Sequence, residues 1–199
     1  MFAGAIYNYG DLKAEECSFR SNVSNAGGAI SNYGHAEIGL TPFNKNSASY
    51  GGAVFNMAKS RISYSNNHSS NLIDDGYIRL IDCNFASNSA NKYGGVICNL
   101  SKAKFNKCVF GKNSASNLAH LISNGPKGVK KQNAADSSGF ISVMTLASCD
   151  FRIKGNLEKN AIYNQPNCLL SVSPDTIVNE QPAHGDLNIF MNEGKMEFE

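Results

Sequence analysis

Hydrophobic and polar positions along the chain form short runs that recur in a fixed order, and the most regular run is Ile/Val-x-Asn. Its copies begin at Ile6, Ile30, Val54, Ile97, Ile122 and Ile162, with a degenerate copy at Ile73. Steps of 19 to 25 residues separate neighbouring copies, except for a last step of 40 residues. A period of this length is typical of a solenoid built from supersecondary repeats. We therefore expect the aliphatic residues to form one interior column.

An aromatic residue followed three positions later by Asn forms a second recurring element. The copies are Phe19…Asn22, Phe43…Asn46, Tyr64…Asn67, Phe85…Asn88 and Phe110…Asn113. A sixth aromatic, Phe151, has Lys154 at the Asn position. We expect the rings to stack inside the molecule. We expect the Asn side chains to hydrogen-bond from one repeat to the next at the corners, where they satisfy buried backbone groups.

A third run lies between these two elements and alternates between apolar and polar residues. Examples are Tyr77-Ile78-Arg79-Leu80 and Lys102-Ala103-Lys104-Phe105. Such alternation is typical of a half-buried strand. The step of three from Leu80 to Cys83 breaks the alternation, so a bend is expected there. Each repeat is therefore predicted to have three short strands and three corners.

These elements predict an all-β protein, a single-stranded right-handed parallel β-helix (pectin-lyase-like solenoid) of about seven coils. Residues 1–172 are expected to form the β-helix, with a loop insertion near 125–138. Residues 173–199 are expected to be an irregular C-terminal segment that caps the last coil. A leucine-rich repeat would need a regular Leu framework, a propeller blade would need about twice the length, and helical repeats do not fit the density of Gly and Asn.

Composition and charge exclude several classes of partner. Hydrophobic residues make up 42% of the chain and charged residues 17%, and the formal net charge is +2. This balance favours a folded domain and gives no reason to expect a nucleic-acid or acidic-membrane partner. No apolar run approaches the ~20 residues of a transmembrane segment. No Cys-x-x-Cys spacing or other metal signature occurs, so no metal site and no cofactor are expected.

The beginning of the chain, Met1 to Ile6, has no basic region followed by an apolar region, so we do not expect an export signal in this chain. Because Gly4-Ala5-Ile6 already belongs to a repeat, we expect further β-helix coils of a longer parent chain on that side, with an open N-terminal edge. The alternative is a chain that starts at Met1.

Four of the six cysteines share one phase, two residues before the aromatic position: Cys17, Cys83, Cys108 and Cys149. Because a buried thiol behaves as a small hydrophobe, a structural column is favoured over disulfides, and all four are expected to point inward. Cys98 follows the core residue Ile97 and is expected to point outward.

The pairing of Gly-Gly-Ala-Ile with Phe-x-x-Asn resembles the repeats of chlamydial polymorphic outer-membrane proteins and of archaeal adhesin-like proteins. Here the pattern reads Gly4-Ala5-Ile6-Tyr7-Asn8 and then Cys17-Ser18-Phe19-Arg20-Ser21-Asn22, and it recurs through Asn113. The resemblance covers residues 2–124 well, extends weakly to about 170, and does not include the last 30 residues. It implies an extracellular or cell-surface passenger that serves in adhesion or as a stalk. Its partners would be host or neighbouring-cell glycans or surface proteins.

Two groups of charged residues are candidates for binding. Asp74, Asp75 and Arg79, with Asp82 nearby, belong to the one charge-rich coil, and β-helix polysaccharide lyases use acidic clusters for Ca²⁺ and a basic residue to take a proton. Lys127, Lys130 and Lys131 lie in the insertion and are suited to an anionic polymer, although a solvated loop is the simpler interpretation.

The first hypothesis for function is a non-catalytic surface-binding or stalk module, with no catalytic residue assigned. The alternative is a fragment of a pectin-lyase-like polysaccharide lyase or glycan hydrolase. Such an enzyme would show an acidic or basic cluster on one face across successive coils, and the aligned Ile/Val-x-Asn positions show none. A repeat segment without independent function is a third hypothesis.

Overall fold

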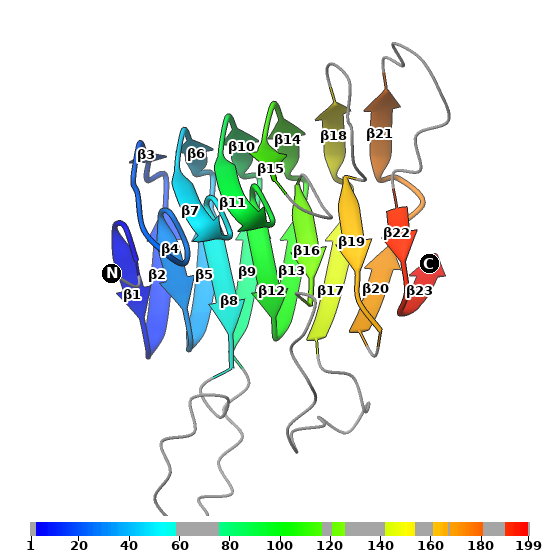
Figure 1. Ribbon diagram of the computed structural model, residues 1–199, viewed down its shortest axis with the longest axis horizontal. Helices are drawn as coiled ribbons and strands as arrows, with labels where there is room; N and C mark the ends of the chain where they lie inside the picture. The colour runs from blue at the N-terminus through cyan, green and yellow to red at the C-terminus, as the bar shows by residue number, and fades with distance from the viewer. Residues whose placement is uncertain are drawn as a thin grey trace, which may run out of the picture.

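All regular structure in the described part of the chain is β-strand, and every pair of neighbouring strands is parallel. The computed structural model describes residues 3–58, 76–116, 121–125, 142–153, 161–166, 168–180 and 190–198, and no helix occurs in these ranges. The strands lie side by side along the long axis of the molecule, with the first and last at opposite ends (Figure 1). This confirms the all-β, parallel prediction and is consistent with a β-helix-like solenoid.

Sheet A is formed by the Ile/Val-x-Asn runs. In spatial order it contains β1 (Ile6–Asn8), β4 (Ile30–Asn32), β8 (Val54–Met57), β12 (Ile97–Leu100), β16 (Ile122–Asn124), β19 (Ile162–Asn164) and β22 (Phe190–Asn192). The register pairs like positions of successive repeats, such as Ile6 with Ile30. The aliphatic column is therefore present, and its first described member, Ile6, packs against the buried core.

Sheets B and C are formed by the two other runs. Sheet B contains β2 (Asp11–Glu15), β5 (His35–Gly39), β9 (Tyr77–Ile81), β13 (Lys102–Asn106), β17 (Ser142–Ala147), β20 (Cys168–Val172) and β23 (Lys195–Phe198). Sheet C contains β3 (Phe19–Arg20), β6 (Pro42–Asn44), β10 (Asn84–Ala86), β14 (Val109–Gly111), β18 (Asp150–Ile153) and β21 (Ile177–Glu180). The chain visits sheets A, B and C in turn, and the sheets enclose one hydrophobic core.

A fourth sheet corrects the prediction of three strands per repeat. Sheet D contains β7 (Ser47–Tyr50), β11 (Ser89–Tyr93) and β15 (Ser114–Ala115). Two isolated parallel bridges, Val23 with Ser47 and Ala26 with Tyr50, pair the preceding repeat with β7. These strands begin with Ser-Ala, of which the Ala is buried. An apolar group as small as one methyl gives almost no hydrophobic alternation, so the sequence pattern did not indicate a strand there.

The aromatic column lies inside, along sheet C. The rings of Phe19, Phe43, Phe85, Phe110 and Phe151 are buried. Successive centroids are 5.0, 4.8, 5.3 and 4.5 Å apart, with interplanar angles of 17° or less. Parallel strand pairing places the rings at this separation, so the strand spacing imposes the stack.

The expected order of the repeats is wrong between residues 58 and 76. Phe43 pairs directly with Phe85, and Val54 pairs directly with Ile97. No strand separates these partners, so the expectation that Tyr64 and Ile73 supply the intervening positions fails. Tyr64 and Ile73 themselves lie outside the described residues.

The C-terminal prediction also needs correction, because strands continue beyond residue 172. β22 pairs with β19, so that Phe190 follows Ile162 and Asn192 follows Asn164 in sheet A. β21 and β23 extend sheets C and B in the same way. The sequence pattern missed β22 because this strand begins with Phe190, whereas the recognised copies of the run begin with Ile or Val.

The corners use left-handed backbone at repeating positions. Asp82 and Lys107 have φ of 51° and 52°, and each follows a strand of sheet B at the bend expected between Leu80 and Cys83 or the equivalent residues. The corner before sheet A uses Gly51, with φ of 63°. A Cβ on Gly51 would collide with the carbonyl oxygen of Val54. Glycine is therefore required there, while longer side chains are tolerated at the other corner.

Two columns of Asn side chains run through the corners. In the first, each Nδ2 donates to the Oδ1 of the next Asn at 2.7 to 2.9 Å, through Asn8, Asn32, Asn56, Asn99, Asn124, Asn164 and Asn192. In the second, Asn22, Asn46, Asn88 and Asn113 are joined at 2.9 or 3.0 Å. The same amides also donate to backbone carbonyls, such as Phe43 O from Asn88. The predicted structural role of these residues is thereby confirmed.

The cysteines follow the prediction only in part, and none of the six forms a disulfide bond. Cys83, Cys108 and Cys149 are buried, but Cys17 is exposed, which contradicts the prediction. In sheet C, β3 is the last strand on that side, so no described strand covers the Cys17 thiol. Cys98 points away from the main core but is buried in a second cluster with Tyr33 and Phe55.

Candidate functional site

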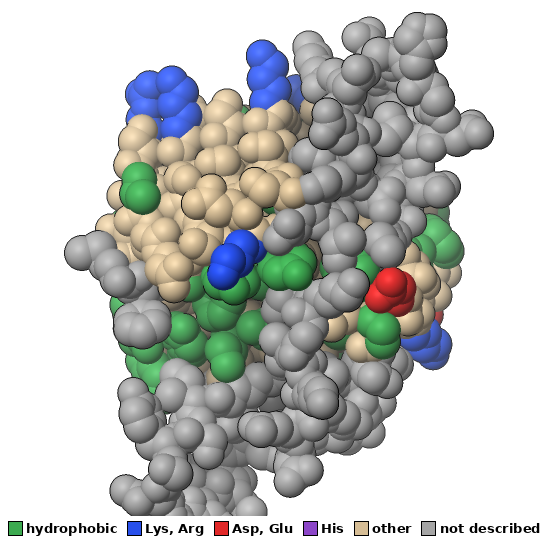
Figure 2. Space-filling model, viewed as in Figure 1, with side chains coloured by type: hydrophobic (Ala, Val, Ile, Leu, Met, Phe, Trp, Pro, Cys, Tyr) green, Lys and Arg blue, Asp and Glu red, His purple; other side chains and the backbone are tan. Residues whose placement is uncertain are grey.

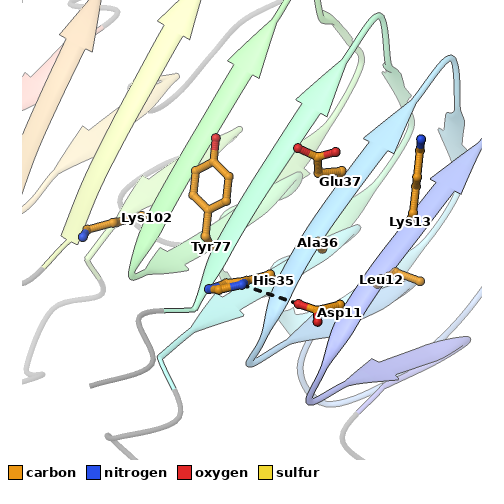
Figure 3. A pocket seen from close by; sticks show the side chains of 8 residues that line it. All are labelled: Asp11, Leu12, Lys13, His35, Ala36, Glu37, Tyr77 and Lys102. Carbon is orange, nitrogen blue, oxygen red and sulfur yellow. Dashed lines mark ion pairs between the residues drawn. The ribbon is translucent and has the colours of Figure 1, made fainter. Parts of the chain in front are cut away.

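An open groove with a volume of about 550 Å³ lies on the outer face of sheet B. Its polar lining is Asp11, Lys13, His35, Glu37, Tyr77 and Lys102, from strands β2, β5, β9 and β13 (Figure 3). Because side chains alternate along a strand, the residues that alternate with the inward-facing Ile78 and Leu80 face outward. We call this surface the sheet B groove.

The register of sheet B arranges the outward side chains in two rows that cross the strands. One row is Asp11, His35, Tyr77 and Lys102, and the next is Lys13, Glu37, Arg79 and Lys104. Neighbouring members of a row belong to strands ~4.8 Å apart. Each row therefore runs along the stack of strands and presents a line of functional groups.

Two weak ion pairs lie within the rows. His35 Nδ1 is 3.5 Å from Asp11 Oδ1, a contact that becomes an ion pair when the imidazole is protonated. Arg79 Nη1 is 3.7 Å from Glu37 Oε1. Both separations exceed the usual hydrogen-bond range. The Asp11 side chain is 93% exposed and the Arg79 side chain 40% exposed, so water screens these pairs and each contributes little to stability.

Tyr77 lines the groove, and Arg79 lies beside it on the same strand and the same face of sheet B. Burial raises the pKa of the Tyr77 hydroxyl, with a smaller opposing effect from Arg79, so the hydroxyl keeps its proton at neutral pH. The Nε atom of Arg79 is buried and has no hydrogen-bond partner among the described residues. An unsatisfied buried donor is costly, and it leaves the guanidinium without a fixed set of partners.

Of the residues predicted as binding candidates, only Arg79 belongs to the described part of the chain. Arg79 lies on the sheet B face, as its outward phase predicts. Asp74 and Asp75 lie outside the described residues, as do Lys127, Lys130 and Lys131. Asp82 is exposed and occupies the corner after β9 instead of the sheet face.

The sequence interpretation missed the other groove residues for a specific reason. It compared charges at the middle position of the Ile/Val-x-Asn runs, which belong to sheet A. Aligning the alternating runs of sheet B instead places Lys13, Glu37, Arg79 and Lys104 in one line. This face therefore carries charged side chains of both signs on successive strands, which the comparison of sheet A positions could not reveal.

A second surface, over sheet A, is apolar. Tyr7 and Tyr9 are 50% and 48% exposed, and their rings stack with centroids 6.3 Å apart. Both contact the buried ring of Tyr33, which packs on Phe55. Figure 2 shows hydrophobic side chains gathered on this side of the molecule and Lys and Arg side chains along its upper edge. The rings of Tyr7 and Tyr9 therefore lie on the outer side of sheet A, next to Tyr33 of the second cluster.

No family model, no curated protein and no solved structure matches this chain. The described residues contain no group of three or more His, Cys, Asp or Glu side chains placed to hold a metal ion. They also contain no helix that is long and apolar enough to cross a membrane.

Proposed function

We propose that this protein is a non-catalytic, surface-exposed adhesin-like or stalk module, built as a right-handed, single-stranded parallel β-helix of about seven coils. The seven parallel strands of sheet A support the coil number. The right-handed coiling is supported by the general rule that crossovers between parallel strands are right-handed in about 98% of cases. The proposed location is the cell surface, and the proposed partners are glycans or surface proteins of a host or neighbouring cell.

The observation that carries this proposal is the sheet B groove, an open row of polar side chains along the stack of strands. Asn32 and Asn56 of the first Asn column donate to the backbone carbonyls of Tyr77 and Lys102, so the row is held on fixed strands. A rigid row of charged and hydroxyl groups is suited to binding a long ligand at several points. It gives the module reach and a repeating contact surface.

The polysaccharide lyase alternative is less well supported by the same groove. Catalysis by a carboxylate or a basic residue generally needs exclusion of water and a tuned pKa. Here the Asp11 side chain is 93% exposed and that of Glu37 is 58% exposed. Asp11 also lies beside the His35 imidazole, and Glu37 lies beside the Arg79 guanidinium. Such hydrated carboxylates are suited to contacting hydroxyl groups and cations of a ligand.

The proposal is tested by incubating the full chain with arrays of polysaccharides and surface proteins, with and without Ca²⁺. The expected result is retention of a ligand with no change in its chain length. Release of unsaturated or newly reducing sugars would reject the non-catalytic function, above all if the release were lost on Asp74→Ala or Asp75→Ala. Labelling of intact source cells with an antibody to the chain tests the proposed location, and labelling only after lysis would contradict it.

A further inference from the structure

Two cations are neighbours in register on the sheet B face. Arg79 of β9 and Lys104 of β13 are register partners, and their side chains share the outer face. Like charges at such positions repel each other and destabilise the pairing of the strands. The ion pair of Arg79 with Glu37 lies on the side away from Lys104, and no ion pair of Lys104 is found among the described residues. An anion bound between the two side chains would replace this repulsion with attraction.

Two further cations lie on the same face, although Glu37 stands between Lys13 and Arg79 in the row. Lys102 lies two residues before Lys104 on the same face of β13, and Lys13 stands at the opposite end of the row. Members of the row are separated by multiples of ~4.8 Å, a distance comparable with the length of one sugar unit. A polymer that carries an anion on successive units could contact several of these cations at once.

We infer that the outer face of sheet B binds an acidic polysaccharide along the groove, with the carboxylate or sulfate groups of successive sugars at Arg79 and Lys104, which lie in register beside the lining residues. This inference rests on the binding function proposed above and names its ligand class. The guanidinium of Arg79 holds a planar anion through paired donors, and Lys104 acts as a point charge beside it. The Tyr77 hydroxyl and the Glu37 carboxylate contact sugar hydroxyls as donor and acceptor.

The apolar content of the face favours a polysaccharide over a protein partner. Tyr77 and Ile81 are the large apolar outward-facing side chains of β2, β5, β9 and β13, and both are only half-buried. Protein interfaces concentrate their binding energy in desolvated apolar and aromatic centres. A ligand rich in hydroxyl groups needs no such centre, and a single ring suffices to pack against its C–H surface.

The test uses the full chain and a matched pair of polymers, dextran sulfate and uncharged dextran, with polygalacturonate as the carboxylated probe. Binding is measured by titration at low salt and at physiological salt. We expect binding to at least one of the two acidic polymers and no binding to dextran, with affinity that falls as salt screens the exposed charges. The double variant R79Q/K104Q is expected to weaken that binding about tenfold, the joint effect of two exposed ion pairs each worth a few-fold.

The control variant is K45Q/K112Q, which removes the same charge from exposed corner residues that directly follow β6 and β14 of sheet C, away from the sheet B face. It is expected to change the affinity by less than about twofold. An equal loss in both double variants would overturn the inference, because the binding would then reflect net charge alone. Equal affinity for dextran and dextran sulfate would also overturn it, while leaving the proposed glycan-binding function intact.

Two further outcomes separate the inference from the proposed function. Retention of a surface protein through the groove, with no binding of either acidic polymer, would overturn the inference and leave the binding module standing. Cleavage of polygalacturonate, with the R79Q/K104Q dependence preserved, would reject the non-catalytic function and support the ligand class. Unchanged unfolding free energies for both double variants show that the fold is not the cause of any loss.

Discussion

The side-chain amide of Asn56 donates a hydrogen bond to the side-chain oxygen of Asn99 at 2.7 Å, although 43 residues separate the two along the chain. Both side chains are fully buried. The bond joins β8 to β12 and continues the column from Asn32 to Asn124. The column therefore stays unbroken at the point where the sequence repeat becomes irregular.

Asn99→Ala is expected to lower the free energy of unfolding by about 3 kcal/mol, because removal of one partner leaves buried polar groups without a hydrogen bond. The groups affected are the amide of Asn56 and the carbonyl of Ser101. Urea unfolding measures the loss. Asn91→Ala, at an exposed position of β11, is the control, with an expected change within about 0.5 kcal/mol. Equal losses in the two variants would show that the column contributes nothing beyond an ordinary surface Asn.

Sequence periodicity was sufficient to predict the main columns, because stacking repeats the same chemical environment at each step. Phe43, Phe85 and Phe110 occupy equivalent environments, so the same residue type recurs and can be aligned. It was harder to predict which repeats are neighbours within each column. Val54 pairs with Ile97 across a long intervening segment, and an alignment by residue type cannot distinguish a repeat from an insertion that resembles one.

The groove was less predictable than the columns, because exposed positions carry no recurring residue type. His35, Tyr77 and Lys102 share one row but have nothing in common chemically. Only the register of sheet B places them together, and the register depends on which strands are neighbours. A partial alternation signal was present, and it placed Arg79 correctly on the outer face.

The left-handed glycine corner gives a second prediction. Gly51→Ala is expected to destabilise the protein by at least about 2 kcal/mol, since alanine at positive φ is strained and its Cβ would meet the Val54 carbonyl oxygen. Gly111→Ala is the matched control, because a Cβ there meets no atom within 4 Å. Thermal unfolding should show a clear decrease in Tm for Gly51→Ala and little change for Gly111→Ala. The reverse order would contradict the assigned corner geometry.

Thiol accessibility gives a third prediction. Of the six cysteines only Cys17 is exposed, so one thiol per native chain should react rapidly with a water-soluble disulfide reagent. Burial raises the pKa of Cys149 to about 11, which further suppresses its thiolate at neutral pH. All six should react after denaturation. Cys17→Ser should abolish the rapid reaction and Cys149→Ser should not, whereas rapid labelling of a second thiol would show that the core opens readily.

Alkaline pH gives a fourth prediction, through Cys98. Its thiol is buried with Tyr33, Phe55 and Leu100, and burial raises the pKa of Cys98 to about 12 from a value of 9.0 in the unfolded chain. Below pH 9 both states keep the proton, so the full stability is present. Above pH 9 the unfolded state loses the proton while the folded state keeps it. The free energy of unfolding therefore falls as pH rises, until the folded thiol also ionises near pH 12.

Cys98→Ala removes this contribution and is measured against wild type by urea unfolding at several pH values. At neutral pH the variant is expected to be less stable by about 1 kcal/mol, from lost packing. The stability difference should shift by about 1.4 kcal/mol in favour of the variant between pH 8 and pH 10, which makes the variant the more stable protein at pH 10, because only the wild-type unfolded state gains a thiolate at position 98. This window lies below the ionisation of the buried tyrosines, since burial also raises the pKa of Tyr33.

Cys17→Ala is the control: its thiol is exposed in the folded state, so its stability difference from wild type should stay constant. A constant difference for Cys98→Ala as well would mean that the thiol reaches water in the folded protein and that the second cluster is not closed.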